Sequence, residues 1–543
     1  MINLEEYIRR KKLGIGGIEE AEGNEAIKVT FVNDLEKIER MKVIECGTWY
    51  EGDGDRLLNF YTRTLNIDYN YEPFYDRNKR NYFWAESATE EDIKRTHSGI
   101  VKTIIDTITG ICGEPKITGK YIDNELQGIL DENEFYTALY AQEQMPLTLV
   151  EGWGAYKIDW DTDLSNRPIV MYYRANDVGF IKRYKRIIGI IYKDFYTDGK
   201  KKYLVVETRY RKNGNLYIDK DAFEVIADDD ELKPIALKEL KFLSNTDDRI
   251  EVTNYNGFLG VPCIFFKDTE GTRPGRSIIE NKIDLCDDYD QCFSQRANTV
   301  RESTPMSYYD TSYLERDPVT NLPIAPKSFN RKYTTYKGTV NADGINDGKG
   351  PVTVTQPKLD FLQYDGEAAA LLTEIVNGIL SPASLGVDLA KKDNADAQRE
   401  KEKVTVFTRN KILKSETVIL KKLMNELMCA QELMNTGSIT TKEYDIDVEF
   451  SEFADDSFEN KIGTLSTPLS LKAISPKMYL KKLYGNSLSE SEFNEELAYI
   501  EEAMNENDSE NENDAEFGTD NNEPGFDDFG PEESDLEPEG VNS

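Results

Sequence analysis

Apolar residues between Leu359 and Met434 form two helical stripes, separated by a polar interruption. Spacings of three and four residues place the first set on one helix face: Ala368, Leu371, Leu372, Ile375 and Ile379. A second set predicts a longer helix: Ile412, Leu413, Ile419, Leu420, Leu423, Met424, Leu427 and Met428. Between them, Ser381–Gly386 predicts a loop and the polar Asn394–Glu402 an exposed helical segment. Two long helices joined by a loop suit an assembly or a moving part better than an enzyme pocket.

A third helix is predicted earlier in the chain. Apolar residues recur at helical spacing through Arg276–Arg301, a stretch that would extend about 39 Å as a helix. Between this helix and the next, residues 302–358 are rich in Gly, Pro and Asn, with strand candidates at Pro305–Tyr309 and Val352–Thr355. We therefore expect two helical rods that bracket a small β-rich tip.

The first 270 residues combine helical and strand patterns. Residues 1–86 predict an irregular aromatic surface, whereas Ala88–Ile111 and Asn124–Gln144 predict helices, with His97 packed in the apolar stripe of the former. Alternating apolar positions, separated by Asp198-Gly199 and Asn213-Gly214 turns, predict strands at 153–160, 168–174, 187–195, 202–211, 216–218 and 222–225. We expect an antiparallel sheet of four to seven strands over residues 150–266.

The C-terminal part ends in an acidic segment. Asp445–Phe450 alternates as a strand, and helices are predicted at Ser457–Lys472, from Ser475 onward and at Ser489–Ala503. Residues 501–543 contain 17 acidic residues and no Lys or Arg. Such a composition predicts disorder, because few side chains can form a core.

Length and charge limit the functional classes. The 543 residues predict three or four structural units, and the formal net charge of −35 opposes tight binding to nucleic-acid phosphates. The six cysteines are scattered without a C-x-x-C pair, so we expect reduced, buried thiols and no zinc site. With no secretory signal and no apolar run of membrane-spanning length, the sequence predicts a cytosolic origin.

Catalytic patterns are weak throughout the sequence. His97 is the single histidine, which leaves little basis for a Ser-His-Asp or Cys-His site. Gly344–Gly350 departs from the phosphate-loop spacing, and the aspartates at 159, 161 and 163 fit a hairpin turn better than a calcium loop. Asp445, Asp447 and Glu449 alternate along a strand and leave a metal-dependent nuclease as an alternative.

The order of these segments resembles the portal proteins of tailed double-stranded DNA bacteriophages, in particular the siphophage type of Gram-positive hosts. The similar stretches are Thr48–Asp53, an aromatic-glycine motif; Thr96–Ile117, a helix ending in a G-x-P-I-like turn that Lys116 interrupts; Gly275–Arg301; Leu359–Met428; and Glu449–Asp456 followed by Ser475-Pro476. Together they cover residues 45–505, and their order carries the resemblance. The acidic tail lies outside it.

This resemblance implies an α+β, portal-like fold with eight segments. They are a wing (1–270), a stem helix (271–301), a clip (302–358), a second stem helix (359–380), a tunnel loop (381–396), a long helix and strand returning to the wing (397–456), crown helices (457–505) and a disordered acidic tail (506–543). The implied protein is a ring, commonly of twelve subunits, at one capsid vertex of the virion, assembled in the host cytoplasm. It would package, retain and eject the genome without enzymatic activity.

The resemblance also implies site residues and partners. The DNA-facing tunnel loop would contain Ser381, Pro382, Leu385, Gly386, Asp388, Lys391, Lys392 and Asp393. The stem would contain Arg276, Ile279, Ile283, Tyr289, Phe293, Arg296, Leu371, Leu372 and Ile375, and the clip Pro305, Tyr308, Tyr309, Arg331, Lys332, Val352 and Val354.

Expected partners are other copies of the chain, weakly held double-stranded DNA, the terminase large subunit, head-completion or adaptor proteins, and the major capsid and scaffolding proteins. No catalytic residue, metal, cofactor or membrane is expected. A virion or scaffold protein without a channel is the second alternative to this interpretation.

Overall fold

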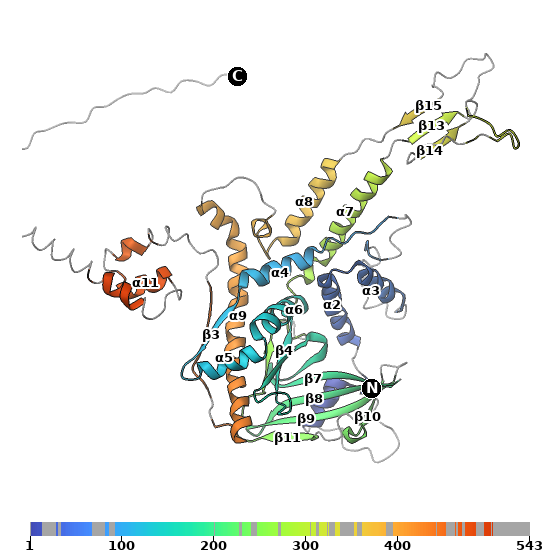
Figure 1. Cartoon of the computed structure of the whole chain (residues 1–543). Coiled ribbons are helices and arrows are strands. Elements are labelled where there is room, and N and C mark those ends of the chain that lie inside the picture. The colour runs from blue at the N-terminus through green and yellow to red at the C-terminus, as the bar shows by residue number, and fades with distance from the viewer. Residues whose placement is uncertain are drawn as a thin grey trace, which may run out of the picture. The chain divides into compact units, whose positions relative to one another are not determined.

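The computed structural model describes residues 2–13, 29–30, 34–67, 82–85, 93–199, 201–226, 231–240, 247–269, 273–303, 306–310, 314–322, 324, 332–336, 352–355, 361–386, 395–440, 443–451, 462, 465–469, 473–484, 493–500 and 502. The chain divides into two compact units, Met1–Phe453 and Ala454–Ser543. Helices and largely antiparallel sheets coexist in the first unit (Figure 1), which confirms the α+β class.

The largest sheet has eight strands in the order β1-β2-β10-β9-β8-β7-β6, with β11 also paired to β9. Its strands are β1 (Ile2–Asn3), β2 (Val29–Thr30), β6 (Val178–Arg183), β7 (Arg186–Asp198), β8 (Lys201–Lys212), β9 (Asn215–Ile226), β10 (Glu231–Ile235) and β11 (Arg249–Val252). Asn213 and Gly214 both have positive φ, 56° and 82°, as a tight hairpin turn between β8 and β9 requires. The two strands predicted at 216–218 and 222–225 are one continuous strand.

A separate three-stranded sheet has the order β12-β4-β5. It contains β4 (Gly154–Asp159), β5 (Ile169–Arg174) and β12 (Gly260–Cys263), and β4 pairs antiparallel with β5. The predicted hairpin is therefore confirmed, but it does not belong to the large sheet as expected. A Cβ on Gly154 would lie 2.1 Å from Tyr172 Oη, so this position requires glycine.

The predicted irregular aromatic surface of residues 1–86 is wrong for the described part of that region. Three helices form there: α1 (Leu4–Leu13), α2 (Asp34–Glu51) and α3 (Gly54–Ile67). Trp49 and Tyr61 are fully buried, and Trp49 Nε1 donates to Tyr61 Oη at 2.9 Å. Tyr61 in turn donates to Glu45 Oε1 at 2.7 Å, so these aromatic residues join two helices rather than cover a surface.

Helices between the N-terminal segment and the sheets are shorter than predicted. The structure has α4 (Ile100–Cys112), α5 (Asp123–Glu132), the π-helix η3 (Phe135–Gln144) and α6 (Met145–Glu151). Residues 93–99 belong to no helix or strand, and Gly99 has a φ of 65°, so within the described residues the helix predicted from Ala88 begins only at Ile100. A two-stranded sheet pairs β3 (Pro115–Gly119) with β16 (Ile446–Phe450), confirming the predicted strand at 445–450.

Long helices follow the sheets. They are α7 (Ile283–Glu302), α8 (Phe361–Val376) and α9 (Ala395–Thr436), with the 3₁₀ turns η6 (Glu280–Lys282) before α7 and η8 (Pro382–Leu385) after α8. Two further 3₁₀ turns are η4 (Ala175–Asp177) and η5 (Leu237–Glu239). The 42 residues of α9 extend about 63 Å at 1.5 Å per residue.

A small sheet lies between α7 and α8 in the sequence. It contains β13 (Met306–Asp310), β14 (Lys332–Tyr336) and β15 (Val352–Thr355). Strand β13 is central and pairs parallel with β14 and antiparallel with β15. The two predicted strands are confirmed, and β14 is additional.

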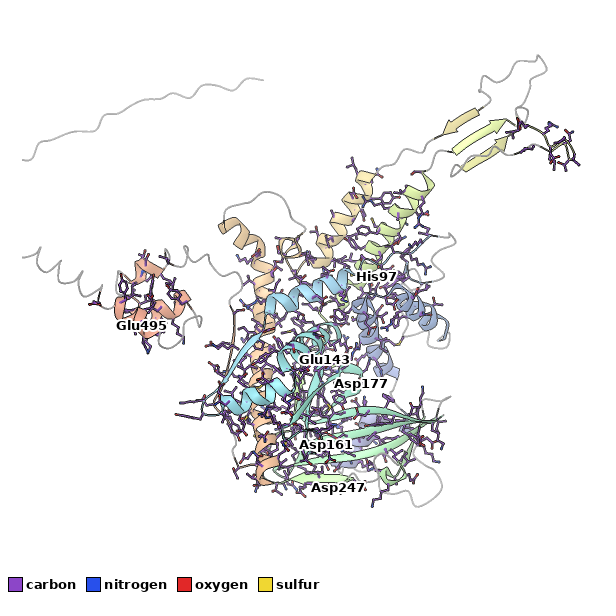
Figure 2. The ribbon with its side chains drawn as sticks, viewed as in Figure 1. His97, Glu143, Asp161, Asp177, Asp247 and Glu495 are labelled. Atoms are coloured by element: carbon purple, nitrogen blue, oxygen red, sulfur yellow. The ribbon has the colours of Figure 1, made fainter. Side chains whose placement is uncertain are left out.

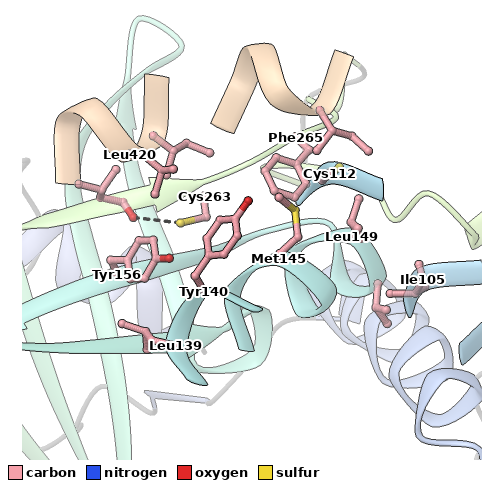
Figure 3. Close-up of a cluster of buried hydrophobic side chains, with 14 of the residues drawn as sticks. Ile105, Cys112, Leu139, Tyr140, Met145, Leu149, Tyr156, Cys263, Phe265 and Leu420 are labelled. Atoms are coloured by element: carbon pink, nitrogen blue, oxygen red, sulfur yellow. Dashed lines mark hydrogen bonds between the residues drawn. The ribbon is translucent and has the colours of Figure 1, made fainter. Parts of the chain in front are cut away.

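The main core lies where α4, β4 and β12 pack against α9, with α6 against α4 and β4. Figure 3 shows Tyr140, Tyr156, Cys263 and Leu420 together, although they come from η3, β4, β12 and α9. All eight apolar residues of the second predicted stripe are buried on α9. Since burying each such side chain contributes about 1.5–3 kcal/mol, this stripe fixes α9 to the main core of the first unit. The six cysteines are buried and free, as expected.

The second unit contains α11 (Pro476–Tyr484), which begins directly after Ser475 as predicted, and residues 493–500 are also helical. The acidic tail lies outside the described residues, apart from Glu502. Among the helices that the structure describes, none is long and apolar enough to cross a membrane.

Candidate functional site

The two helices predicted as the stem are α7 and α8, which pack side by side in opposite directions (Figure 1), and we keep the name stem for this helix pair. Just before α7, Lys282 Nζ donates to the carbonyl oxygen of Glu374 at 2.6 Å. Toward the other end of α7, Thr299 Oγ1 lies 3.2 Å from Tyr364 Oη. Residue 282 therefore contacts the end of α8 and residue 299 contacts its beginning, so the two helices form an antiparallel pair.

Most of the predicted stem residues pack inside this first unit. Ile279, Ile283, Tyr289 and Ile375 are buried, and Phe293, Leu371 and Leu372 are partly buried against the core. Arg296 forms a 3.1 Å ion pair with Asp365 across the two helices. These side chains hold the two helices together and pack them on the core of the first unit.

The predicted start of the first stem helix is wrong. Arg276 and Ile279 precede the helix, which begins at Ile283 after a short 3₁₀ turn. The Arg276 backbone N–H donates to Phe266 O at 2.8 Å, and the Arg276 side-chain Nε lies 3.0 Å from Asp268 Oδ1. The Ile278 N–H donates to Leu149 O at 3.0 Å. These contacts to residues outside the segment hold it in a non-helical path.

A buried carboxylate on α7 anchors the segment that precedes α4. Asp290 accepts hydrogen bonds from Trp84 Nε1 at 3.1 Å and from the Ser98 backbone N–H at 2.9 Å, and lies 2.6 Å from His97 Nδ1. Figure 2 labels His97 near the base of the stem. The His97 side chain is therefore buried and structural as predicted, although the residue lies in a segment outside helices and strands rather than on a helix.

Asp287, one helical turn before Asp290, holds the adjoining segment. It accepts the backbone N–H groups of Phe83 at 2.7 Å and Trp84 at 3.3 Å. Burial raises the pKa of Asp287 to about 7, although these two N–H groups lower it. The stem base is thus tied to distant parts of the chain by two carboxylates, which the periodicity of α7 did not reveal.

Helix α8 exposes no cation. Residues 361–386 contain no Lys or Arg. The exposed residues of α8 and the turn after it are Leu362, Gln363, Asp365, Gly366, Glu367, Ala369, Ala370, Thr373, Glu374, Asn377 and Gly378. The surface is therefore small, neutral or acidic, and it offers no side chain that would neutralise a phosphate.

The predicted tunnel loop begins as an ordered turn. Ser381 is buried, its backbone N–H donates to Thr405 Oγ1 at 2.9 Å, and Ser384 Oγ lies 2.7 Å from the same oxygen. Gly386 ends η8 with a φ of 71°. Ser381 is therefore part of the support of the loop, not an exposed DNA-facing group as predicted.

The other predicted loop residues lie partly within and partly outside the described residues. Pro382 and Leu385 are partly exposed in η8, whereas Asp388, Lys391, Lys392 and Asp393 lie outside the described residues. Helix α9 begins at Ala395, before the predicted end of the loop at 396.

The clip sheet fixes the backbone of several predicted contact residues. Tyr308 pairs with Thr353 and Tyr309 with Val352, while Val354 pairs with Ser307. Lys332 is the first residue of β14. Pro305 and Arg331 lie outside the described residues, as does Gly344–Gly350.

Sequence reasoning missed an exposed apolar turn within the clip. Asp317 Oδ1 accepts the N–H groups of Val319 at 2.7 Å and Thr320 at 3.1 Å, and the Asp317 N–H donates to Leu322 O at 2.9 Å. These bonds shape a turn that leaves Val319 90% and Leu322 65% exposed. Ile324 is exposed as well. The apolar residues after Asp317 could have indicated this turn, but their spacing matches neither a strand nor a helix.

A buried acid on α9 faces η3. Glu416 is fully buried, and its Oε2 accepts a hydrogen bond from Gln144 Nε2, at the end of η3, at 3.1 Å. Three nearby buried atoms have no hydrogen-bond partner within the described residues: Glu416 Oε1, Gln144 Oε1 and Tyr156 Oη. Burial raises the pKa of Glu416 to about 8, so the group is largely protonated at neutral pH.

The acidic residues on which the nuclease alternative rests are exposed to solvent, and two of them form ion pairs with lysines. Asp447 and Glu449 are exposed on β16, and Lys421 Nζ lies 3.0 Å from Asp447 Oδ1. Lys120 lies 3.9 Å from Asp445. No cluster of three His, Cys, Asp or Glu residues within the described part of the chain could hold a metal ion. The 159–163 segment is a turn, with Asp161 O accepting from Leu164 and Ser165.

A cavity of about 290 Å³ lies between α1, α2 and strands β6 and β7. Several of its charged side chains pair with one another or with neighbours, such as Lys193 with Glu5 at 3.1 Å and Arg273 with Glu280 at 2.9 Å. Nothing in this arrangement joins a nucleophile to a base. The surfaces of the stem, clip and α9 are therefore stronger functional candidates than this cavity.

Comparisons of the sequence with models of protein families and with curated proteins found no match.

Proposed function

We propose that this chain is a subunit of a ring that conducts double-stranded DNA, in the manner of the phage portal proteins that its sequence resembles. The observation that carries the proposal is the antiparallel α7–α8 stem, in which α8 has no Lys or Arg and exposes side chains that are neutral, most of them small, or acidic. A small β-sheet interrupts the chain between the two helices.

A conducting channel requires a surface that does not hold DNA. Double-stranded DNA carries one negative charge per about 1.7 Å, and each Lys or Arg that neutralises a phosphate adds affinity. A wall of glycine, alanine and threonine, flanked by carboxylates, would keep the duplex mobile. Gly366, Ala369, Ala370 and Thr373 supply such a ridge along one side of α8.

The remaining segments have roles consistent with this proposal. The clip turn with exposed Val319 and Leu322 would dock the terminase large subunit and later the head-completion proteins, because exposed apolar groups often mark protein-interaction sites. The loop after Gly386 would approach DNA in the channel. The protein would act in the virion, at one capsid vertex, without enzymatic activity.

Mass measurement of the purified full-length protein tests the proposal. Size-exclusion chromatography with light scattering should give one species with the mass of a large closed oligomer, of the order of twelve subunits as the resemblance implies. A monomer over a wide range of protein concentration and salt would contradict the proposal.

A further inference from the structure

Helix α9 presents an exposed face that combines lysines with apolar residues. Consecutive steps of three or four residues join Val404, Phe407, Lys411, Lys414, Val418 and Lys422, so they share one side of the helix. All six are exposed, Phe407 to 72%. We call these six residues the basic face of α9; it extends about 27 Å.

The charge of this face is opposite to that of the whole protein. Between residues 403 and 425, every exposed ionisable residue of α9 is a lysine, whereas the chain has a net charge of −35. The acid within this stretch, Glu416, is buried on the other side. Lys414 and Lys422 form no ion pair with the described residues, and Lys411 Nζ lies 4.8 Å from the centre of the Phe266 ring.

A complementary surface exists on the stem of the same chain. Asp284 and Asp288 are exposed on α7, and Glu367 and Glu374 are exposed on one side of α8. Burial, and then the neighbouring charges of Asp284 and Glu367, raise the pKa of Asp288, which indicates that carboxylates of the two helices gather there. We call these four residues the acidic edge of the stem.

The acidic edge and the small-residue ridge lie on adjacent sides of α8. Glu367 and Glu374 are seven residues apart and therefore nearly aligned, whereas Gly366, Ala369 and Thr373 follow a neighbouring line along the helix, and Ala370 lies where the two lines meet. One surface of the stem can thus meet another protein while the adjacent one remains open to a channel.

We propose that the basic face of α9 in one copy of the chain docks on the acidic edge of the stem in the next copy. This inference rests on the proposed ring and names the surfaces that would close it. The two surfaces differ, so their contact is heterologous, and repeated heterologous contacts generate a ring when the rotation closes. Charge complementarity would set the orientation of neighbouring subunits.

DNA is a less suitable occupant of the basic face. Phosphate contacts need cations, but Val404, Phe407 and Val418 occupy half of the six positions and would remain in water beside a phosphate backbone. A protein surface can cover these side chains while carboxylates meet the lysines. Apolar groups among charged ones are therefore better explained by another copy of the chain.

Charge reversal on each surface, made in the full-length protein, tests this contact. The first variant combines Lys411→Glu, Lys414→Glu and Lys422→Glu, and the second combines Asp284→Lys, Asp288→Lys and Glu367→Lys. Each alone should need a roughly tenfold or higher protein concentration for half-maximal assembly, because like charges would then oppose each other. Light scattering measures assembly, and circular dichroism verifies folding.

Mixing the two variants gives the sharper result. In a 1:1 mixture every reversed α9 face can meet a reversed stem edge of opposite charge, so the mixture should assemble at a lower protein concentration than either variant alone. A control variant, with Lys202→Glu, Lys212→Glu and Lys233→Glu on the large sheet, changes the net charge as the α9 variant does and should assemble as the wild type does.

Three outcomes would overturn the inference: normal rings from the α9 variant, two folded variants that fail to assemble when mixed, or equal loss of assembly in the control. Normal rings combined with weaker retention of a double-stranded DNA fragment would assign the basic face to DNA instead. A wild-type protein that never assembles would contradict the proposed function itself, whereas wild-type rings that these variants leave unchanged would contradict only the contact.

Discussion

Replacement of Glu416 by glutamine should stabilise the protein, by an amount that grows with pH. Glu416 is fully buried on α9, and one neutral donor, Gln144 Nε2, contacts its carboxyl group within the described residues. Burial raises its pKa to about 8, compared with about 4.3 for an exposed glutamate. Glutamine keeps the shape and a carbonyl acceptor for Gln144, but it cannot ionise.

The sign of the effect follows from proton binding. Between about pH 4.3 and pH 8 the folded protein retains a proton on Glu416 that the unfolded chain releases, so the free energy of unfolding of the wild type falls as pH rises. The loss is about 1.4 kcal/mol per pH unit, and it reaches about 3–4 kcal/mol at pH 7. The Glu416→Gln variant lacks this loss, and the difference should level off above pH 8.

Urea unfolding at equal protein concentration, followed by tryptophan fluorescence at pH 5, 6, 7 and 8, measures this difference. The matched control is Glu125→Gln on the exposed side of α5, for which no pH-dependent difference from the wild type is expected. Other buried acids titrate in the wild type and the variant alike, so they cancel in the comparison. If the difference in the free energy of unfolding between the wild type and Glu416→Gln stays constant from pH 5 to pH 8, the conclusion that Glu416 is buried and protonated is wrong.

The other predictions concern the stem base, the clip and the loop. Asp290→Ala should reduce the free energy of unfolding by about 3 kcal/mol, because buried donors lose their acceptor, whereas Asp288→Ala on the exposed side should change it by less than about 0.5 kcal/mol; urea unfolding distinguishes the two. Replacing Val319 and Leu322 together by serine should leave the thermal unfolding temperature unchanged but weaken binding to purified terminase large subunit roughly tenfold in a titration; equal affinity would exclude the clip turn as a contact. Deletion of Leu385–Asp393 should preserve rings but impair DNA packaging or retention, and normally filled particles would remove the functional role of the loop.

Several elements were predictable because their signals are local. The Asn213-Gly214 pair adopts positive φ at both residues, a property of the turn itself, so the β8–β9 hairpin followed from sequence. The apolar stripe of α9 has a strict helical period and is buried throughout. In the same way, Ser475 precedes α11 and its side chain accepts the Met478 backbone N–H at 3.2 Å.

The errors arose where distant contacts decide the local structure. The segment from Arg276 to Ile279 has helical spacing, but its backbone N–H groups bind Phe266 and Leu149. The segment around His97 is not helical, and Asp290 binds its Ser98 backbone N–H and its His97 side chain. Leu149 and Asp290 lie more than a hundred residues away in sequence, and periodicity within one segment does not reveal such contacts.

Some features of the candidate surfaces can likewise be predicted from the sequence, whereas others depend on the folded structure. The absence of cations from residues 361–386 can be read directly from the sequence. The opposite charges of the α9 face and the stem edge become visible only when the buried Glu416 of α9 is separated from the exposed lysines of that helix. The clip turn has no period at all, and its exposure follows from backbone bonds around Asp317.

Electron microscopy of the purified full-length protein tests the central claim most directly. Class averages should show closed rings with a central channel, of a size that admits double-stranded DNA. Single small particles, or assemblies without a pore, would contradict the account.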